Sequence, residues 1–252
     1  MLALLKQLWS RHAAPHPDKI YTPPRLHKFP SSSRTPDRWD TLLDASLNKI
    51  TKDLASMPPT SCGLSGTPEV HRFHGLKEGQ EFILTGENGT DGSIARVIHT
   101  PGHTDDSICL HLQEDQALFT FDSVLGQGTA VFENLSQYMS SLQHLLDLSA
   151  NSKTAFTKLY PGHGPVVEGG KTLLQQYIAH RLEREEQLVK ILSSRREGGD
   201  GRWTVDQLLE KVYPPHVWEM ARRGVLLHLH KLEVDGKVSK SQREGVDAWT
   251  LL

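Results

Sequence analysis

Three side chains suited to metal binding, His103, Asp122 and His163, follow predicted β-strands in this sequence. A Pro-Gly pair precedes each histidine, which forces a tight turn after the strand and presents the imidazole on a stiff loop. A neutral imidazole ligates a metal through one nitrogen, and a carboxylate has two oxygens with which it can bridge two cations. One such histidine alone is better explained as a turn residue or a buried partner. The three together predict a metal site.

The sequence around these residues alternates between strand-like and helix-like patterns. Short apolar or alternating runs predict strands, whereas apolar positions three or four apart over residues 135–148 predict a helix. This alternation favours an α/β layered domain. The predicted strands cover residues 70–73, 81–84, 93–99, 107–112, 117–121 and 158–160, and a further surface helix is predicted over 40–57.

A second, smaller unit is predicted near the C-terminus. A long helical pattern over residues 171–194 ends in a charged, glycine-rich segment, 195–202, which has the composition of a linker. Two helical patterns, 204–213 and 216–235, and a hairpin pattern over 236–252 follow it. Two helices followed by a small hairpin are the order of a winged helix-turn-helix unit.

Four runs of residues resemble motifs of the metallo-β-lactamase superfamily. They are TPGHT at 100–104, VLGQGT at 124–129, YPGHGP at 160–165 and YIAHRLERE at 177–185. The last run and the winged-helix-like tail favour the lactamase-like endoribonucleases, a subgroup similar to fungal polyketide thioesterases. The resemblance implies an α/β fold, in which a partial metallo-β-lactamase αββα sandwich over residues 1–194 precedes a small winged-helix-like domain over residues 203–252.

The same resemblance implies a role for each candidate ligand. His103 would ligate one zinc ion, His163 would ligate a second, and Asp122 would bridge both. A hydroxide held by the two ions would be the nucleophile, so the reaction would need no side-chain nucleophile. The implied substrate is an acyl thioester or single-stranded RNA, because such a hydroxide attacks thioesters and phosphodiesters alike, and a fold does not choose between them.

The first metal-binding motif of the superfamily, HxHxDH, does not occur in these 252 residues. The single HxH run, His228-Leu229-His230, falls in a predicted helix and has Leu232 where the motif needs aspartate. Residues 2–9 and 23–29 resemble the segments that follow the motif, so we expect Met1 to fall just downstream of it. Each zinc ion would then have two protein ligands instead of the usual three, which predicts weak zinc binding and impaired catalysis.

Phe121 is a smaller departure from the superfamily, which commonly has glycine directly before the bridging aspartate. A bulky side chain at this position is expected to crowd the backbone near the metals.

The first 17 residues have two interpretations. They contain basic residues but no acidic one, and their leucines can line one face of a helix. This is typical of an organelle transit segment, and also of an amphipathic helix within the fold, which the resemblance favours. A cytoplasmic and a mitochondrial location therefore both stay open.

Composition excludes several classes of protein. The net charge of -2 and the isoelectric point near 6.7 give no overall basic field, so nucleic-acid binding would need a local patch. Two cysteines without CxxC spacing, Cys62 and Cys109, are too few for a disulfide framework, and Cys109 lies in an apolar run typical of a core. No apolar run approaches the roughly 18 residues of a membrane span, so no membrane association is predicted.

A candidate basic patch lies in the C-terminal unit. Acidic residues are interspersed there, which favours an ordinary solvated face over a surface that follows a nucleic-acid backbone. The alternative function is nevertheless a non-catalytic protein whose winged-helix-like domain binds nucleic acid or a partner. The basic residues are Arg222, Arg223, Lys231, Lys237, Lys240 and Arg243.

Overall fold

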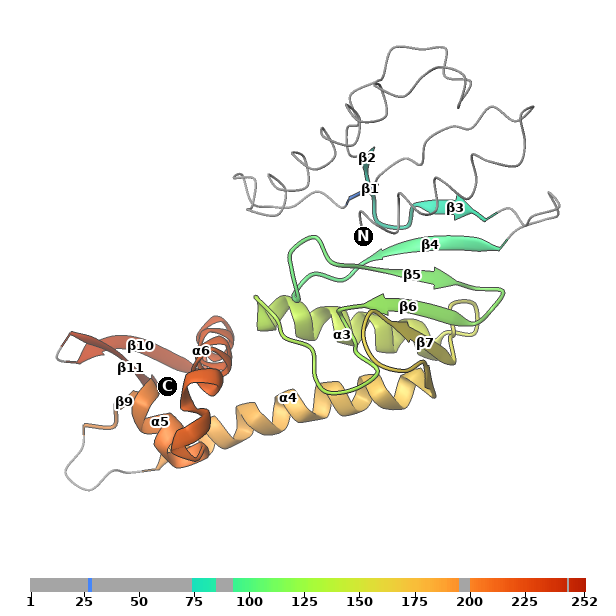
Figure 1. The fold of residues 1–252 in the computed structure, drawn as a ribbon. Coiled ribbons are helices and arrows are strands. Elements are labelled where there is room, and N and C mark those ends of the chain that lie inside the picture. Colours follow the sequence, from blue (N-terminus) through green and yellow to red (C-terminus); the bar gives the residue numbers. More distant parts are fainter. Residues whose placement is uncertain (1–26, 29–73, 85–92, 195–199, 244) are drawn as a thin grey trace, which may run out of the picture. The chain divides into compact units, whose positions relative to one another are not determined.

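The computed structural model of the 252-residue chain describes residues 27–28, 74–84, 93–194, 200–243 and 245–252 (Figure 1). The predictions made for residues 1–17, 40–57 and 70–73, and for Cys62, lie outside these ranges. The described residues belong to two compact units, one that ends at Leu76 and one that runs from Lys77 to Leu252. The first contains a short parallel pair of strands, β1 (His27–Lys28) and β2 (His74–Gly75).

The second unit contains a six-stranded sheet that carries the candidate site. Its strands lie in chain order, and each neighbouring pair is antiparallel except β6 and β7, which are parallel. Helix α3 (Leu135–Ala150) connects this parallel pair, as a crossover must. The strands are β3 (Glu81–Ile83), β4 (Ile94–His99), β5 (Ile108–Leu112), β6 (Ala117–Phe121), β7 (Lys158–Pro161) and β8 (Val167–Glu168).

Helices α3 and α4 (Gly170–Ser193) pack with this sheet around one apolar core. Sheet residues such as Leu118 and Leu159 are fully buried there against Leu142 and Leu145 of α3. Cys109 belongs to the same core, as its apolar run predicted. The α/β class is therefore confirmed, and the described residues supply one β layer and one helical layer of the predicted sandwich.

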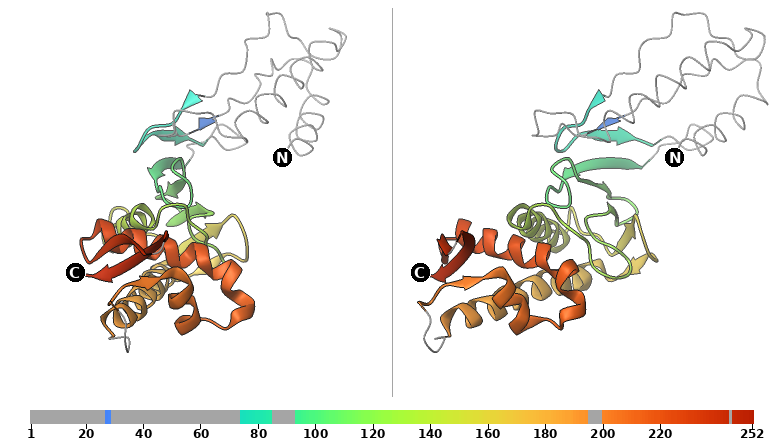
Figure 2. Two further views of the ribbon diagram at one scale, coloured as in Figure 1. Left: turned by 90° about the vertical axis from the view of Figure 1, so that its left-hand side faces the viewer. Right: turned by 60° about the vertical axis from the view of Figure 1, so that its left-hand side comes forward.

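The C-terminal part forms a three-stranded antiparallel sheet with two helices (Figure 2). Thr204 and Gln207 make a capping box that fixes the start of the first helix. Two-residue strand β9, which the sequence pattern did not predict, pairs with β11. The elements are β9 (Trp203–Thr204), α5 (Val205–Val212), the 3-10 turn η1 (Pro215–Val217), α6 (Trp218–Val234), β10 (Val238–Arg243) and β11 (Val246–Leu251).

Helix α4 contributes to both apolar cores. Leu174 and Tyr177 pack in the sheet core, while Leu188 and Leu192 pack in a second core around Leu229 and Trp249 of the C-terminal part. One continuous 24-residue helix thus connects the sheet with the predicted winged helix. The domain boundary between residues 194 and 203 stays a prediction.

None of the helices in the described ranges is long and apolar enough to cross a membrane.

Candidate metal centre

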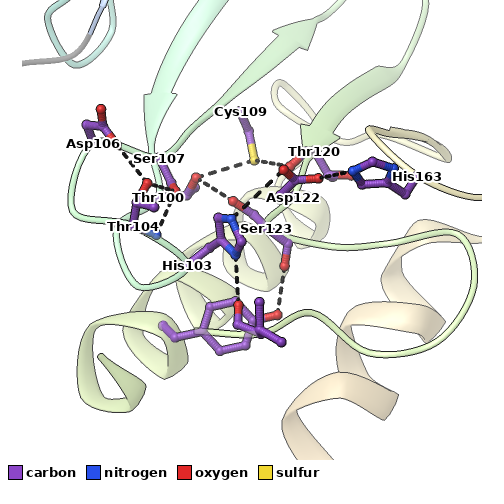
Figure 3. A network of polar contacts seen from close by, with 12 residues as sticks. Thr100, His103, Thr104, Asp106, Ser107, Cys109, Thr120, Asp122, Ser123 and His163 are labelled. Atoms are coloured by element: carbon purple, nitrogen blue, oxygen red, sulfur yellow. Dashed lines mark hydrogen bonds and ion pairs between the residues drawn. The ribbon is translucent and has the colours of Figure 1, made fainter. Parts of the chain in front are cut away.

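The three predicted ligands meet at one edge of the sheet. Strands β4, β6 and β7 point the same way, because β5 is antiparallel to both β4 and β6 and β7 is parallel to β6. The loops that follow them carry His103, Asp122 and His163 respectively. In Figure 3 the two imidazoles approach Asp122 from opposite sides. The His103 Nε2 atom lies 3.9 Å from Oδ2 of Asp122, and the His163 Nε2 atom lies 3.3 Å from Oδ1.

The turn that presents His103 depends on Gly102. This residue has φ +135°, and a Cβ atom there would lie 2.4 Å from the Cα of Tyr138 in α3. Its carbonyl oxygen accepts hydrogen bonds from the backbone N–H groups of Glu133 (2.7 Å) and Asn134 (3.1 Å). The Pro-Gly turn is therefore pressed against the start of α3, and only glycine fits the space.

A backbone carbonyl fixes the tautomer of His103. Its Nδ1 donates a hydrogen bond of 2.8 Å to the carbonyl oxygen of Val131, because a carbonyl can only accept. In the neutral ring the hydrogen then sits on Nδ1, and the lone pair on Nε2 faces the Asp122 carboxylate. A carbonyl bound to the far nitrogen is the usual orientation of a metal-ligating histidine.

One oxygen of the Asp122 carboxylate lacks a hydrogen-bond donor among the described residues. Its Oδ1 atom is buried and accepts no hydrogen bond from the described residues, although His163 Nε2 lies 3.3 Å away. Gly162 permits this close approach, since a Cβ atom there would lie 2.9 Å from Oδ1. An imidazole nitrogen and a carboxylate oxygen at this distance can be bridged by a hydrogen or by a cation, so the donor set fits a metal ion.

Within the described residues, the candidate ligands form two separate histidine–carboxylate pairs and not one cluster of three or more ligands. No group of three or more His, Cys, Asp and Glu side chains within the described ranges is arranged to hold one metal ion. Each histidine instead faces its own oxygen of Asp122. This arrangement matches the predicted bridging role of the aspartate, and the ligand assignment itself stays a prediction.

The unusual feature of Phe121 is its backbone conformation. It has φ +46°, a left-handed conformation that is an outlier for a bulky residue and that glycine adopts freely. The pairing of β6 with β7 is irregular between Phe119 and Phe121, which turns Asp122 out of the strand. Phe121 is 41% exposed and its backbone is strained, and the crowding near the metals stays a prediction.

A buried polar network lies beneath the site, and its thiol is not a nucleophile. The hydroxyl groups of Thr100 and Ser123 lie 3.1 Å apart, and the Cys109 sulfur lies 3.5 Å from the Thr100 hydroxyl (Figure 3). Burial raises the pKa of the Cys109 thiol to about 12, which keeps it protonated and unreactive. The network positions the strand ends.

Helix α4 holds the loop between Asp122 and α3, a role that sequence reasoning did not identify. The Tyr177 hydroxyl accepts a hydrogen bond from the backbone N–H of Leu125 (3.1 Å) and lies within donating distance of the Gly128 carbonyl (3.2 Å). Arg181 donates to the carbonyl of Ala130 (3.0 Å). The available signal was the run at 177–185, whose first and fifth residues are these two side chains.

The other histidine pair lies in a helix, as the sequence predicted. His228 and His230 lie within α6, and His228 is buried at 3% exposure. Burial and the nearby Arg181 cation lower the pKa of His228 to about 4. A neutral, buried ring in a helix cannot replace the HxHxDH motif.

Most of the basic side chains in the C-terminal part have acidic partners within the chain. Lys231 and Lys237 both contact the carboxylate of Glu185 in α4, at 2.7 and 2.8 Å. Arg222 pairs with Asp206, and Lys240 pairs with Asp247. These pairings support the solvated face over a nucleic-acid-binding patch.

Sequence comparison with known proteins agrees with the architecture described above. Residues 204–249 match the family model of the Beta-lactamase associated winged helix domain. The Beta-lactamase-like protein 2 homolog of Caenorhabditis elegans is 39% identical over 178 residues, which are 69% of this chain and 55% of that protein. An atrochrysone carboxyl ACP thioesterase of Claviceps purpurea (strain 20.1) is 29% identical over 230 residues, 84% of this chain and 72% of that protein.

Solved structures share the same architecture. A metallo-beta-lactamase family protein from Thermus thermophilus superposes with a TM-score of 0.59 at 19% identity, covering 90% of this chain and 72% of that one. The chain therefore has the metallo-β-lactamase fold, with a β-lactamase-associated winged helix at its C-terminal end. It belongs to the metallo-β-lactamase superfamily. The chain spans little more than half the length of the Beta-lactamase-like protein 2 homologs of C. elegans and Drosophila melanogaster, 55% and 57%.

Proposed function

We propose that this chain provides part of a zinc-dependent hydrolase site that cleaves acyl thioesters. The observation that carries the proposal is the approach of two imidazoles to the two oxygens of one aspartate, with the His103 tautomer fixed by Val131. His103 and His163 would each hold one zinc ion, and Asp122 would bridge them. Zinc bound there would supply a Lewis acid and would lower the pKa of a bound water.

The chain's own residues prepare the site for this chemistry. The Val131 carbonyl keeps a hydrogen on the far nitrogen of His103, so the near nitrogen stays available as a ligand. Gly162 leaves Oδ1 of Asp122 accessible to His163. The residues from Val124 to Phe132 form the neighbouring loop, which Tyr177 and Arg181 hold in place beside the strand ends.

The thioester is preferred over RNA because a relative is named as a thioesterase and because most basic residues of the winged helix are paired internally. Two protein ligands per ion is one fewer than catalytic zinc sites usually keep. Weak zinc binding therefore stays the prediction for this chain.

The test is zinc content by elemental analysis of the 252-residue protein after dialysis against zinc. We expect bound zinc that is lost in both His103→Ala and His163→Ala, and retained in His144→Ala, which removes an exposed histidine of α3. Zinc content that is zero, or that is unchanged in the two site variants, would overturn the proposal. Hydrolysis of an acyl thioester and of a single-stranded RNA, each compared with His103→Ala, then identifies the substrate, and cleavage of RNA alone would contradict the thioester.

A further inference from the structure

We infer that Arg181 is a positioning residue for His103, acting through the loop segment 130–132. This inference rests on the proposed function in that His103 is taken as a ligand. Arg181 lies in α4 and touches none of the three candidate ligands in the contacts described above. Its effect on the site passes through the backbone carbonyl of Val131, which accepts the hydrogen bond from Nδ1 of His103.

Arg181 contacts the residues on both sides of Val131. Its Nη2 donates a hydrogen bond of 3.0 Å to the carbonyl of Ala130. Its guanidinium lies over the ring of Phe132, with 4.8 Å between the central carbon and the ring centroid. A guanidinium can make these two contacts at once because it is planar and carries its donors at the edge.

Val131 does not fix its own position. Val131 is 72% exposed, whereas Ala130 and Phe132 are buried at 3% and 7% exposure. The orientation of the Val131 carbonyl is therefore set by its neighbours, and both neighbours are held by Arg181. Phe132 also stacks on Tyr138 of α3, with 5.4 Å between the ring centroids.

The placement of Arg181 is costly, which supports a specific role. The residue is 9% exposed, and its buried Nε atom has no hydrogen-bond partner in the described part of the chain. Burying a cation disfavours folding unless specific contacts compensate for the lost hydration. Among the contacts that compensate here are the two that flank Val131. A leucine or methionine would fill the same space at lower cost if packing were the whole purpose.

The loss of Arg181 should release the carbonyl that selects the tautomer of His103. Without an acceptor near Nδ1, the neutral imidazole exchanges its hydrogen between both nitrogens. A ring in which Nε2 carries the hydrogen cannot ligate a metal through that nitrogen. Arg181 thus prepares the ligand before any metal binds.

The experiment is ¹⁵N NMR of the histidine rings in the metal-free 252-residue protein at alkaline pH, where imidazoles are neutral. The unmodified protein should show His103 with its hydrogen on Nδ1, as two well-separated ring ¹⁵N resonances. In Arg181→Met and Phe132→Leu we expect the two resonances to move toward one another. Arg181→Lys, which keeps the charge and one donor, should give a smaller shift.

Two controls make the result specific. Arg184→Met removes a cation from the same helix that lies over the ring of Tyr213 at 4.7 Å, and it should leave His103 unchanged. His111, buried in β5, reports on folding through its own ring resonances. An unchanged His103 tautomer in both Arg181→Met and Phe132→Leu, with His111 unaltered, overturns the inference. If His111 shows that Arg181→Met is unfolded, Arg181→Lys and Phe132→Leu decide. Because no metal is present, the outcome does not depend on whether the chain hydrolyses a substrate.

Discussion

The strand ends at the sheet edge and the winged-helix part differ in how their charged side chains are paired. At the sheet edge, the Nε2 atoms of His103 and His163 face a carboxylate of which one buried oxygen accepts no hydrogen bond from the described residues. In the winged-helix part, Lys231 and Lys237 share the carboxylate of Glu185, and Thr204 begins α5 with a reciprocal capping box. Burial raises the pKa of Glu185, but hydrogen bonds from the two lysines outweigh it and leave that pKa below its usual range.

The backbone shows the same contrast. The sheet edge contains Phe121 in a left-handed conformation and Gly102 pressed against α3, whereas Gly236, at the end of α6, has open space around it. Strain and unpaired polar atoms cost free energy, and they persist where the surrounding structure holds them. The sheet edge thus combines a strained backbone with an unpartnered carboxylate oxygen, whereas Lys231, Lys237 and Glu185 of the winged-helix core are paired with one another.

The largest loss of stability is expected from a substitution at Gly102, in the strained backbone of the sheet edge. Gly102→Ala should lower the free energy of unfolding by roughly 3 kcal/mol or more, because the new Cβ would overlap the backbone of Tyr138 and the φ of +135° disfavours any side chain. Gly236→Ala, at φ +70° with no atom within 4 Å, should cost only about 1 kcal/mol. Urea denaturation of both variants measures the difference, and equal costs would contradict the proposed strain at the site.

A change of similar size in the free energy of unfolding is expected at His228, in helix α6 of the winged-helix part. Burial lowers its pKa from 6.5 to about 4, so between these values the unfolded chain binds a proton that the folded chain does not. The stability that this neutral ring contributes is present above pH 6.5 and is lost as the pH falls toward 4, by about 3 kcal/mol in all. Chemical denaturation across this range should show a smaller loss in His228→Leu than in the unmodified protein. His144→Leu, at an exposed position, serves as the control and should follow the unmodified protein.

The smallest effect is expected at Phe121. Phe121→Gly should change the free energy of unfolding by no more than about 1 kcal/mol in either direction, because relief of the left-handed strain offsets the greater freedom of glycine in the unfolded chain. Phe119→Gly in the same strand should cost about 3 kcal/mol, since Phe119 stacks on Tyr160 at 4.9 Å. Thermal unfolding of the pair checks this prediction. A loss at Phe121 as large as that at Phe119 would mean that its side chain packs in the folded protein as Phe119 does.

Much of this protein could be predicted from local sequence patterns. Alternating and apolar runs predicted strands β3 to β7 to within one or two residues, and the spacing of leucines predicted α3, α4 and α6. Strand β8 and strand β9 escaped prediction because two residues are too short to show a period. The sequence also placed His103, Asp122 and His163 directly after strands, since Pro-Gly turns and strand ends are visible in the residues themselves.

Only the tertiary structure decided how those residues are held. The Val131 carbonyl reaches His103 across 28 positions, and Arg181 reaches Ala130 across 51. Such contacts depend on how α4 packs beside the sheet, and no local period encodes that packing. The strain at Phe121 was likewise hidden, because a phenylalanine in an apolar run looks like any strand residue. Periodicity and turn chemistry act between near neighbours in the chain, so they determine the elements and the residues at their ends. The partners that orient those residues come from distant segments and are set by packing.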